Sequence, residues 1–198
     1  MRVSVFDYGA GNLHSLVKAL EAGGARAIVT PDPVAALEAD ALVLPGVGAF
    51  GAAAARLAPG RSRMRDALAN GLPCLGICLG MQLLFDGSDE GDGAGLGVVS
   101  GRVTRLAAAR VPHMGWNAIE DACDPLFVKA PLREAYYANS FACRPRDTAA
   151  VTAWSRHEDD RFAAAVRVGR AVGVQFHPEK SSSAGVAWLA AWLAEVRR

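Results

Sequence analysis

The chain has 198 residues, of which 52% are hydrophobic and 21% charged, and its formal net charge is +1. A chain of this length fits one domain better than two, and it can bury a core without disulfide or metal staples. The near-zero net charge excludes the strongly basic surface that attracts nucleic acid. We therefore expect a globular protein with a single domain over residues 1–198 and no nucleic-acid partner.

The N-terminus lacks the long apolar run and the small-residue cleavage site of a signal peptide. No stretch approaches the roughly 20 apolar residues that a membrane span needs. We expect a cytoplasmic protein with no membrane contact, whose cysteines stay reduced. The four cysteines contain no C-x-x-C pair, so no zinc site is expected; they are Cys74, Cys78, Cys123 and Cys143.

The first 77 residues alternate strand and helix patterns. Short apolar runs predict strands, and apolar residues at helical spacing predict the helices between them. In chain order the predicted elements are a strand over 3–6, a helix over 13–20 capped by Asn12, a strand over 27–29, a short helix over 34–39, a strand over 41–44, a helical stretch that ends near 70–71, and a strand over 73–77. Such alternation favours a parallel sheet with helices on both faces.

The second half has a different character. A glycine-rich surface loop is predicted over 87–97, and strands then follow with few helices between them, over 101–106, 136–141, 149–154, 162–168 and 171–176. A final helix is predicted where apolar residues from 186 to 196 share one face. The expected fold is α/β, with a mostly parallel central sheet flanked by helices and additional antiparallel strands in the second half.

Cys78 is the candidate nucleophile. It lies in the segment G-I-C-L-G-M-Q at 76–82, where an apolar strand enters and an apolar helix leaves. Glycines on both sides of the central residue are typical of a nucleophile elbow, a sharp turn that presents its side chain at the end of the sheet. The helix N-terminus favours the thiolate form, and the amide of Leu79 is placed to stabilise an oxyanion. The alternative is a buried structural cysteine, which is how we interpret Cys74.

His177 and Glu179 form the candidate base and its orienting acid. His177 follows a strand of the same predicted sheet, and Pro178 fixes the turn that follows it. A carboxylate two residues further along can accept the imidazole N–H and support the charged form, as in Cys-His-acid catalysis. Taken alone, the tripeptide fits a surface turn better than a catalytic site, but paired with the elbow it supplies the second half of the site. The turn P-G-V-G at 45–48 offers a second backbone donor for an oxyanion, or is only the end of a strand.

The segments G-I-C-L-G-M-Q, P-G-V-G and V-Q-F-H-P-E-K-S together resemble the triad-type (class I) glutamine amidotransferases. Two further segments, D-Y-G-A-G-N-L at 7–13 and P-H-M-G-W-N at 112–117, are similar to those of the glutaminase subunits of imidazole glycerol phosphate synthases. The resemblance runs in order over nearly the whole chain. It implies attack of Cys78 on the glutamine carboxamide, a γ-glutamyl thioester, and release of ammonia, with no metal or cofactor.

The resemblance also implies roles for other residues. His177 would transfer protons and Glu179 would orient it, while Val47 and Leu79 would form the oxyanion hole. Positions that would hold glutamine are Gly46, Gln82, Glu90, Ser140 and Phe141. Positions that would face a partner are Asn12, Trp116, Asn117 and Lys180. The implied partner is a (β/α)₈-barrel cyclase subunit that forms a heterodimer with this chain, takes the ammonia through an internal channel, and makes imidazole glycerol phosphate and an aminoimidazole carboxamide ribotide for histidine biosynthesis.

Some of these positions have plainer interpretations. Asn12 suits a helix cap, Trp116 suits a core strand, and Glu90 suits a solvated loop. Asn139 departs from the family, which commonly has a histidine there; asparagine still forms hydrogen bonds but carries no charge near neutral pH.

Three other functions remain as alternatives. The first is an amidotransferase for anthranilate, aminodeoxychorismate or guanylate synthesis, which should lack the D-Y-G-A-G-N and H-M-G-W-N segments. The second is a non-catalytic domain, which should have lost Cys78, His177 or Glu179. The third is a cysteine hydrolase that acts on peptides or esters. A dinucleotide-binding fold is excluded, because the Gly9-x-Gly11 pair lacks the third glycine of the fingerprint.

Overall fold

The computed structural model describes residues 1–9 and 13–198. Its centre is a seven-stranded sheet, and the strands lie side by side in the order β10 (Val151–His157), β11 (Asp160–Val168), β12 (Ala171–Val174), β4 (Cys74–Ile77), β3 (Ala41–Leu44), β1 (Arg2–Phe6) and β2 (Arg26–Thr30). The five strands from β12 to β2 are parallel, and β11 and β10 add antiparallel strands at one edge. The predicted α/β class is confirmed.

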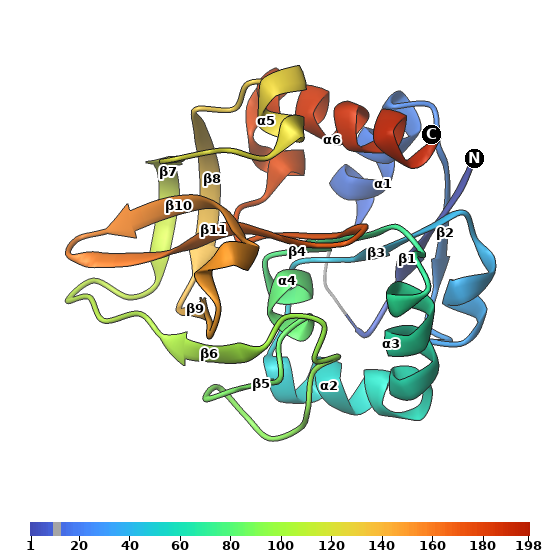
Figure 1. Ribbon diagram of the computed structural model, residues 1–198, viewed down its shortest axis with the longest axis horizontal. Coiled ribbons are helices and arrows are strands. Elements are labelled where there is room, and N and C mark those ends of the chain that lie inside the picture. Colours follow the sequence, from blue (N-terminus) through green and yellow to red (C-terminus); the bar gives the residue numbers. More distant parts are fainter. Residues whose placement is uncertain (10–12) are drawn as a thin grey trace.

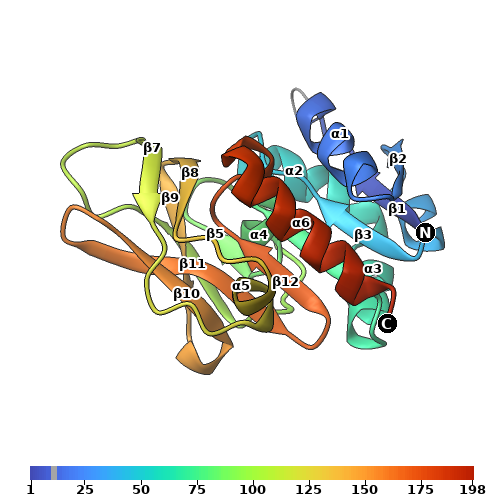
Figure 2. The same ribbon diagram turned by 90° about the horizontal axis from the view of Figure 1, so that it is seen from above.

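Helices cover both faces of this sheet (Figures 1 and 2). One face carries α1 (His14–Ala22), α5 (Pro125–Lys129) and α6 (Ser182–Val196), and the other carries α2 (Phe50–Leu57), α3 (Arg61–Ala69) and α4 (Leu79–Leu83). Each layer has its own apolar core; Trp188 and Trp192 of α6 are buried in the first, and Phe50 of α2 in the second. The central strands are buried on both faces, which explains their continuous apolar sequence. None of the helices in the described part of the chain is long and apolar enough to cross a membrane.

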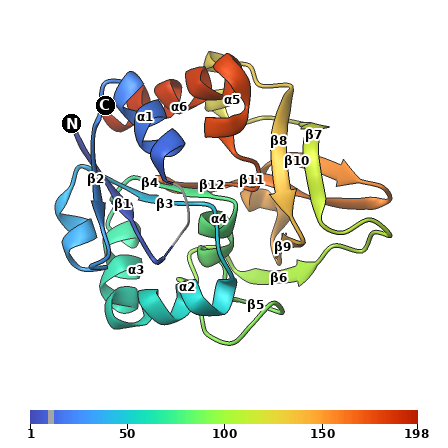
Figure 3. The same ribbon diagram turned by 180° about the vertical axis from the view of Figure 1, so that it is seen from behind.

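Two smaller sheets extend the central sheet at its β10 end (Figure 3). One contains β5 (Gly87–Ser88), β6 (Gly101–Arg105) and β9 (Phe141–Pro145), and the other is the antiparallel pair β7 (His113–Ala118) and β8 (Glu134–Asn139). Short 3₁₀ turns link several elements, at Ala35–Glu38, Ala58–Gly60, Thr148–Ala150 and Pro178–Lys180. These additions bring the end of β8 close to the carboxyl end of β4.

The structure adds the elements β5, β7 and α5, which were not predicted, and it differs from three further expectations. The strand predicted over 136–141 is two strands, because the chain breaks at Ser140 and β8 and β9 pair in different sheets. The helix predicted over 34–39 is a 3₁₀ turn, Ala35–Glu38. The interpretation of Trp116 as a core residue is wrong, since 51% of its surface is exposed on β7. The cap predicted at Asn12 lies outside the described residues.

Candidate active site

Cys78 lies at a strained turn between β4 and α4. Its backbone has φ 48° and ψ −103°, a conformation that is unfavourable for a residue with a side chain. Its amide donates to the Val174 carbonyl at 2.7 Å, which fixes the turn against the neighbouring strand β12. The turn also requires Gly80, because a Cβ there would collide with the carbonyl of Leu44. The sequence therefore forms the predicted strand–turn–helix, with the thiol at the carboxyl end of the sheet.

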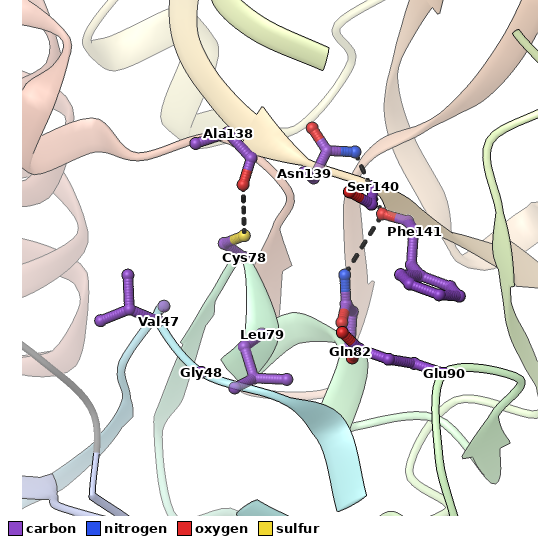
Figure 4. A pocket seen from close by; sticks show the side chains of 11 residues that line it. Val47, Gly48, Cys78, Leu79, Gln82, Glu90, Ala138, Asn139, Ser140 and Phe141 are labelled. Atoms are coloured by element: carbon purple, nitrogen blue, oxygen red, sulfur yellow. Dashed lines mark hydrogen bonds between the residues drawn. The ribbon is translucent and has the colours of Figure 1, made fainter. Parts of the chain in front are cut away.

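The sulfur of Cys78 has polar neighbours on two sides. The Nε2 of Gln175 donates to Sγ at 3.4 Å, and Sγ lies 3.9 Å from the carbonyl oxygen of Ala138 at the end of β8 (Figure 4). Cys78 is 5% exposed, so these contacts are largely shielded from water. A donor directed at the sulfur stabilises a thiolate, and the N-terminus of α4 acts in the same direction.

His177 and Glu179 form an ion pair beside this thiol. The Nδ1 of His177 lies 2.8 Å from Oε1 of Glu179, and the two side chains are 1% and 8% exposed. Burial by itself lowers the pKa of His177, but its interactions with Cys78 and then with Glu179 outweigh burial and raise the pKa to about 9. The imidazole is therefore charged at neutral pH, with one nitrogen directed to the acid and the other available for the thiol.

Backbone contacts hold His177 in this position. Its amide donates to the carbonyl of Tyr136 on β8 at 2.8 Å, and its own carbonyl accepts from the hydroxyl of Ser181 at 2.6 Å. Gly46, after β3, gives the ring its space, since a Cβ there would lie 2.9 Å from Cε1 of His177. Three adjacent parallel strands, β12, β4 and β3, thus present the candidate base, the candidate nucleophile and Gly46 at the carboxyl end of the sheet.

A pocket of about 200 Å³ opens over Cys78. This volume is smaller than the roughly 300–1,000 Å³ typical of pockets for drug-sized ligands, and it suits a single amino acid. All seven residues predicted for the oxyanion hole and for glutamine binding line it; the lining residues are Gly46, Val47, Gly48, Cys78, Leu79, Gln82, Glu90, Ala138, Asn139, Ser140 and Phe141. Figure 4 shows them around the sulfur, and they come from the turns after β3 and β4, from α4, from the 87–97 loop and from the β8–β9 junction.

Two polar side chains on the pocket wall are fixed by hydrogen bonds. Gln82 is 4% exposed, and its Nε2 donates to the carbonyl of Phe141 at 3.3 Å and to Oε1 of Gln175 at 3.4 Å. Glu90 accepts from the amide of Phe50 through Oε2 at 2.9 Å, at the first residue of α2. Glu90 is thus an exposed loop residue that also lines the pocket and is held by one hydrogen bond.

The predicted oxyanion donors, Val47 and Leu79, both line the pocket at Cys78. Leu79 is the first residue of α4, so its N–H has no acceptor within that helix. Val47 and Gly48 lie in the turn after β3, where Gly48 has φ +132°, a backbone conformation that favours glycine.

The residues predicted to face a partner are placed differently from one another. Trp116 on β7 and Lys180 after His177 are exposed. Asn117 is only partly exposed and forms hydrogen bonds within the chain, to the carbonyl of Arg156 at 2.8 Å and to the ring of His113 at 3.2 Å. Asn12 lies outside the described residues.

Sequence reasoning missed Gln175 as a site residue. It is fully buried and donates directly to the sulfur of Cys78. The signal was present, because a polar residue two positions before His177 in an extended segment points to the same side as the histidine. A buried glutamine in an apolar strand has to find partners, and here they are the nucleophile and Gln82.

Comparison with known proteins agrees with this geometry. The family model for "Glutamine amidotransferase class-I" matches residues 4–196. The chain is 46% identical to the imidazole glycerol phosphate synthase subunit HisH of Leifsonia xyli, with 96% of this chain and 97% of that protein covered. It is 43% identical to the subunit of the same name from Corynebacterium glutamicum, over 96% and 97% of the two chains.

Solved structures agree at the level of the fold. The chain matches a crystal structure of a glutamine amidotransferase with a TM-score of 0.75 and 20% identity, over 99% of both chains. It also matches the glutaminase domain of CTPS from Trypanosoma brucei, with a TM-score of 0.69 and 17% identity, over 100% of this chain and 94% of that one. The chain therefore belongs to the class I glutamine amidotransferases and, within them, to the family of the HisH subunits of imidazole glycerol phosphate synthase.

Proposed function

We propose that this chain is a glutaminase that hydrolyses glutamine to glutamate and ammonia through Cys78, His177 and Glu179. The observation that carries the proposal is the buried His177–Glu179 pair, with 2.8 Å between Nδ1 and Oε1, next to a thiol held in a strained elbow. An imidazolium beside a cysteine stabilises the thiolate before substrate arrives, which is the resting state that thiol nucleophiles need.

Each step of the reaction has a group in place. The Cys78 thiolate attacks the carboxamide carbon of glutamine, and the oxyanion accepts hydrogen bonds from the amide of Leu79 and from the Val47–Gly48 turn. His177 donates its proton to the departing nitrogen, so ammonia leaves and a γ-glutamyl thioester remains. His177 then takes a proton from water, and the resulting hydroxide cleaves the thioester to give glutamate and the thiol.

Substrate selection follows from the walls of the pocket. The amide of Gln82 and the carboxylate of Glu90 lie at hydrogen-bonding positions around the pocket, and Ser140 and Phe141 contribute backbone groups. A fixed carboxylate suits the α-ammonium of an amino acid, and backbone N–H groups suit its α-carboxylate. The sites implied by the family resemblance, Gly46, Gln82, Glu90, Ser140 and Phe141, are therefore proposed to hold glutamine.

The partner is proposed to be a (β/α)₈-barrel cyclase subunit that docks as a heterodimer and consumes the ammonia. The curated relatives are named as subunits of imidazole glycerol phosphate synthase, which supports a two-protein enzyme. Trp116 and Met114 leave an exposed apolar stripe on β7, with 51% and 65% of their surfaces accessible, and Lys180 lies beyond the catalytic histidine. We propose that Asn12, Trp116, Asn117 and Lys180 contact this partner.

The test is ammonia release by the purified chain, alone and with the cyclase subunit of the same organism. We expect slow hydrolysis alone and rapid hydrolysis in the complex with its ligand, because the turn at Val47 and Gly48 has to present its N–H to the oxyanion. Loss of all turnover in Cys78→Ala is the control. Wild-type turnover in that variant would overturn the catalytic assignment, and full activity without the partner would overturn its dependence on the complex.

The alternative is the glutaminase of another ammonia-channelling synthase. The distant structural matches support only the fold, which those enzymes share. Co-purification distinguishes the two functions. A cyclase partner should appear as a protein of about 250 residues, the usual size of a (β/α)₈ barrel.

A further inference from the structure

A series of polar side chains, two of them buried, leads from the exposed strand β7 to the glutamine pocket. It involves three side chains outside the proposed triad: Asn117 and His113 on β7, and Asn139 at the end of β8. His113 and Asn139 are cross-strand partners in the β7–β8 pair, and they are 5% and 4% exposed. Buried polar side chains at paired positions must satisfy one another or lose stability.

At the outer end of this series, Asn117 determines which ring nitrogen of His113 carries the proton. The Oδ1 of Asn117 accepts from the amide of Ala118 at 2.8 Å, and its Nδ2 donates to the carbonyl of Arg156 at 2.8 Å, so the amide has one possible orientation. The same Nδ2 lies 3.2 Å from Nε2 of His113. A donor directed at Nε2 requires a lone pair there, so a neutral His113 must carry its proton on Nδ1.

The inner end requires the same arrangement. The Nδ2 of Asn139 donates to the carbonyl of Phe141 at 3.0 Å, which leaves Oδ1 on the other side of the side chain, as Figure 4 shows. Within the described residues, Oδ1 of Asn139 and Nδ1 of His113 are both buried, and neither has a hydrogen-bond partner. Asn139 lies opposite His113 on the paired strand, and its interaction with the ring acts to raise the pKa of His113. Donation from Nδ1–H of His113 to Oδ1 of Asn139 satisfies both atoms.

The environment of His113 disfavours a second proton on its ring. Tyr137 on β8 and His157 on β10 are the titratable groups that stack against it, at centroid distances of 5.0 and 4.2 Å, and Phe162 on β11 meets it edge-on. Burial, and then the electrostatic effect of His157, lower the pKa of His113 to about 4, although the interaction with Asn139 opposes this shift. His113 is therefore neutral at physiological pH.

We infer that Asn117, His113 and Asn139 form a hydrogen-bonded relay that positions the Phe141 carbonyl and Gln82 for glutamine. The relay ends at the Phe141 carbonyl, which accepts from both Asn139 and Gln82. Asn139 also follows directly after Ala138, whose carbonyl faces the sulfur of Cys78. All three are positioning residues. The inference rests on the proposed glutaminase function for its kinetic consequence, but its structural part stands without that function.

The relay gives a specific role to Asn139. Its Oδ1 accepts from His113 while its Nδ2 donates to Phe141, so a single neutral side chain connects a donor to an acceptor. Because Asn117 lies on the strand that carries the exposed Met114 and Trp116, a partner that packs on β7 can alter the relay at its outer end.

The direct test is the tautomer of His113 in the unmodified chain. Long-range ¹H–¹⁵N correlation distinguishes the two ring nitrogens, and the chain has only four histidines, so His113→Gln identifies the signal. We expect a neutral ring with the proton on Nδ1 at pH 7. A proton on Nε2, or a charged ring at that pH, would overturn the relay whether or not the chain is a glutaminase.

The kinetic test uses three variants in the complex with the cyclase subunit. Asn139→Leu removes both bonds of the inner end, and we expect KM for glutamine to rise about tenfold while kcat changes less than about threefold. Asn117→Leu should give a smaller rise in KM and a mixture of His113 tautomers. Glu134→Gln, an exposed change on the same strand as Asn139, is the matched control and should leave KM unaltered. A folded Asn139→Leu with wild-type KM would overturn the positioning role.

Discussion

The two most buried histidines of this chain have opposite electrostatic environments. His177 lies 2.8 Å from a carboxylate and next to a thiol, and these partners raise its pKa to about 9. His113 lies between two aromatic rings and two amides, and burial lowers its pKa to about 4. Burial lowers the pKa of both rings, so the difference comes from their partners. A charged partner prepares a histidine for proton transfer, whereas amide partners make it a fixed donor and acceptor.

Substitution of each histidine by glutamine should separate these roles most strongly. His177→Gln removes the proton carrier, and we expect glutamine hydrolysis by the complex to fall about 10³–10⁴-fold, mostly in kcat. His113→Gln places a neutral amide at this position, and we expect KM for glutamine to change by no more than about tenfold. Steady-state ammonia release measures both. Equal losses in the two variants would contradict the division of roles.

The acid beside His177 should have the next largest effect. Glu179→Gln keeps the shape of the side chain but removes the charge that supports the imidazolium, and we expect kcat/KM to fall about 10²–10³-fold. The pH profile of kcat/KM is the measurement. The limb that reports loss of the His177 proton should move to lower pH in this variant, and an unmoved limb would show that Glu179 does not set the charge of His177.

The stability of the fold should respond to the two histidines at opposite ends of the pH scale. The folded-state pKa of His113, about 4, is below the unfolded value of about 6.5, so its contribution is present above pH 6.5 and is lost as pH falls through 4. The folded-state pKa of His177, about 9, is above that value, so its contribution is present below pH 6.5 and is lost as pH rises through 9.

Melting temperatures from pH 4 to 10 measure this difference. His113→Gln should reduce the loss of Tm on the acid side, and His177→Gln should reduce it on the alkaline side, each by roughly 5 °C. If His113→Gln reduced the loss of Tm only on the alkaline side, if His177→Gln reduced it only on the acid side, or if neither variant changed it, the assigned pKa directions would be contradicted.

The smallest effect is expected at Cys74, the first residue of β4. It is fully buried, and burial raises its pKa well above the ordinary range of a thiol. Cys74→Ala should lower stability by about 1–2 kcal/mol and leave glutamine hydrolysis unchanged. Chemical denaturation with an activity assay checks both. Loss of activity in the folded variant would place Cys74 in the mechanism.

The sequence predicted those parts of the molecule whose cause is local. The strand at Ala41–Leu44 and the elbow at Cys78 follow from short-range patterns, an apolar run and flanking glycines, and both are present with the expected bounds. The break at Ser140 was not predictable, because β8 and β9 differ only in their distant pairing partners. The relay through His113 depends on the same long-range pairing, so the histidine gives no local signal of its role.

The candidate site likewise contains residues with a local sequence signal and residues whose role depends on long-range contacts. Cys78, His177 and Glu179 were recognisable because each lies in a short motif at the end of a strand. Gln175 was missed although it is two residues from His177, since its importance comes from contact with a sulfur that is 97 positions away. Partner-facing positions were predictable only through family resemblance, and Asn117 is bonded within the chain as well as placed near that surface.

The central claim is that Cys78 is the nucleophile for glutamine, and covalent labelling tests it most directly. The chain, in complex with its cyclase subunit, is incubated with an electrophilic glutamine analogue, with and without excess glutamine, and the modified peptides are identified by mass spectrometry. We expect one adduct on Cys78 that glutamine suppresses, with Cys74 and Cys143 unmodified because they are buried and any labelling of the exposed Cys123 unaffected by glutamine. An adduct on Cys78 that glutamine does not suppress, or inactivation with Cys78 unmodified, would contradict the account.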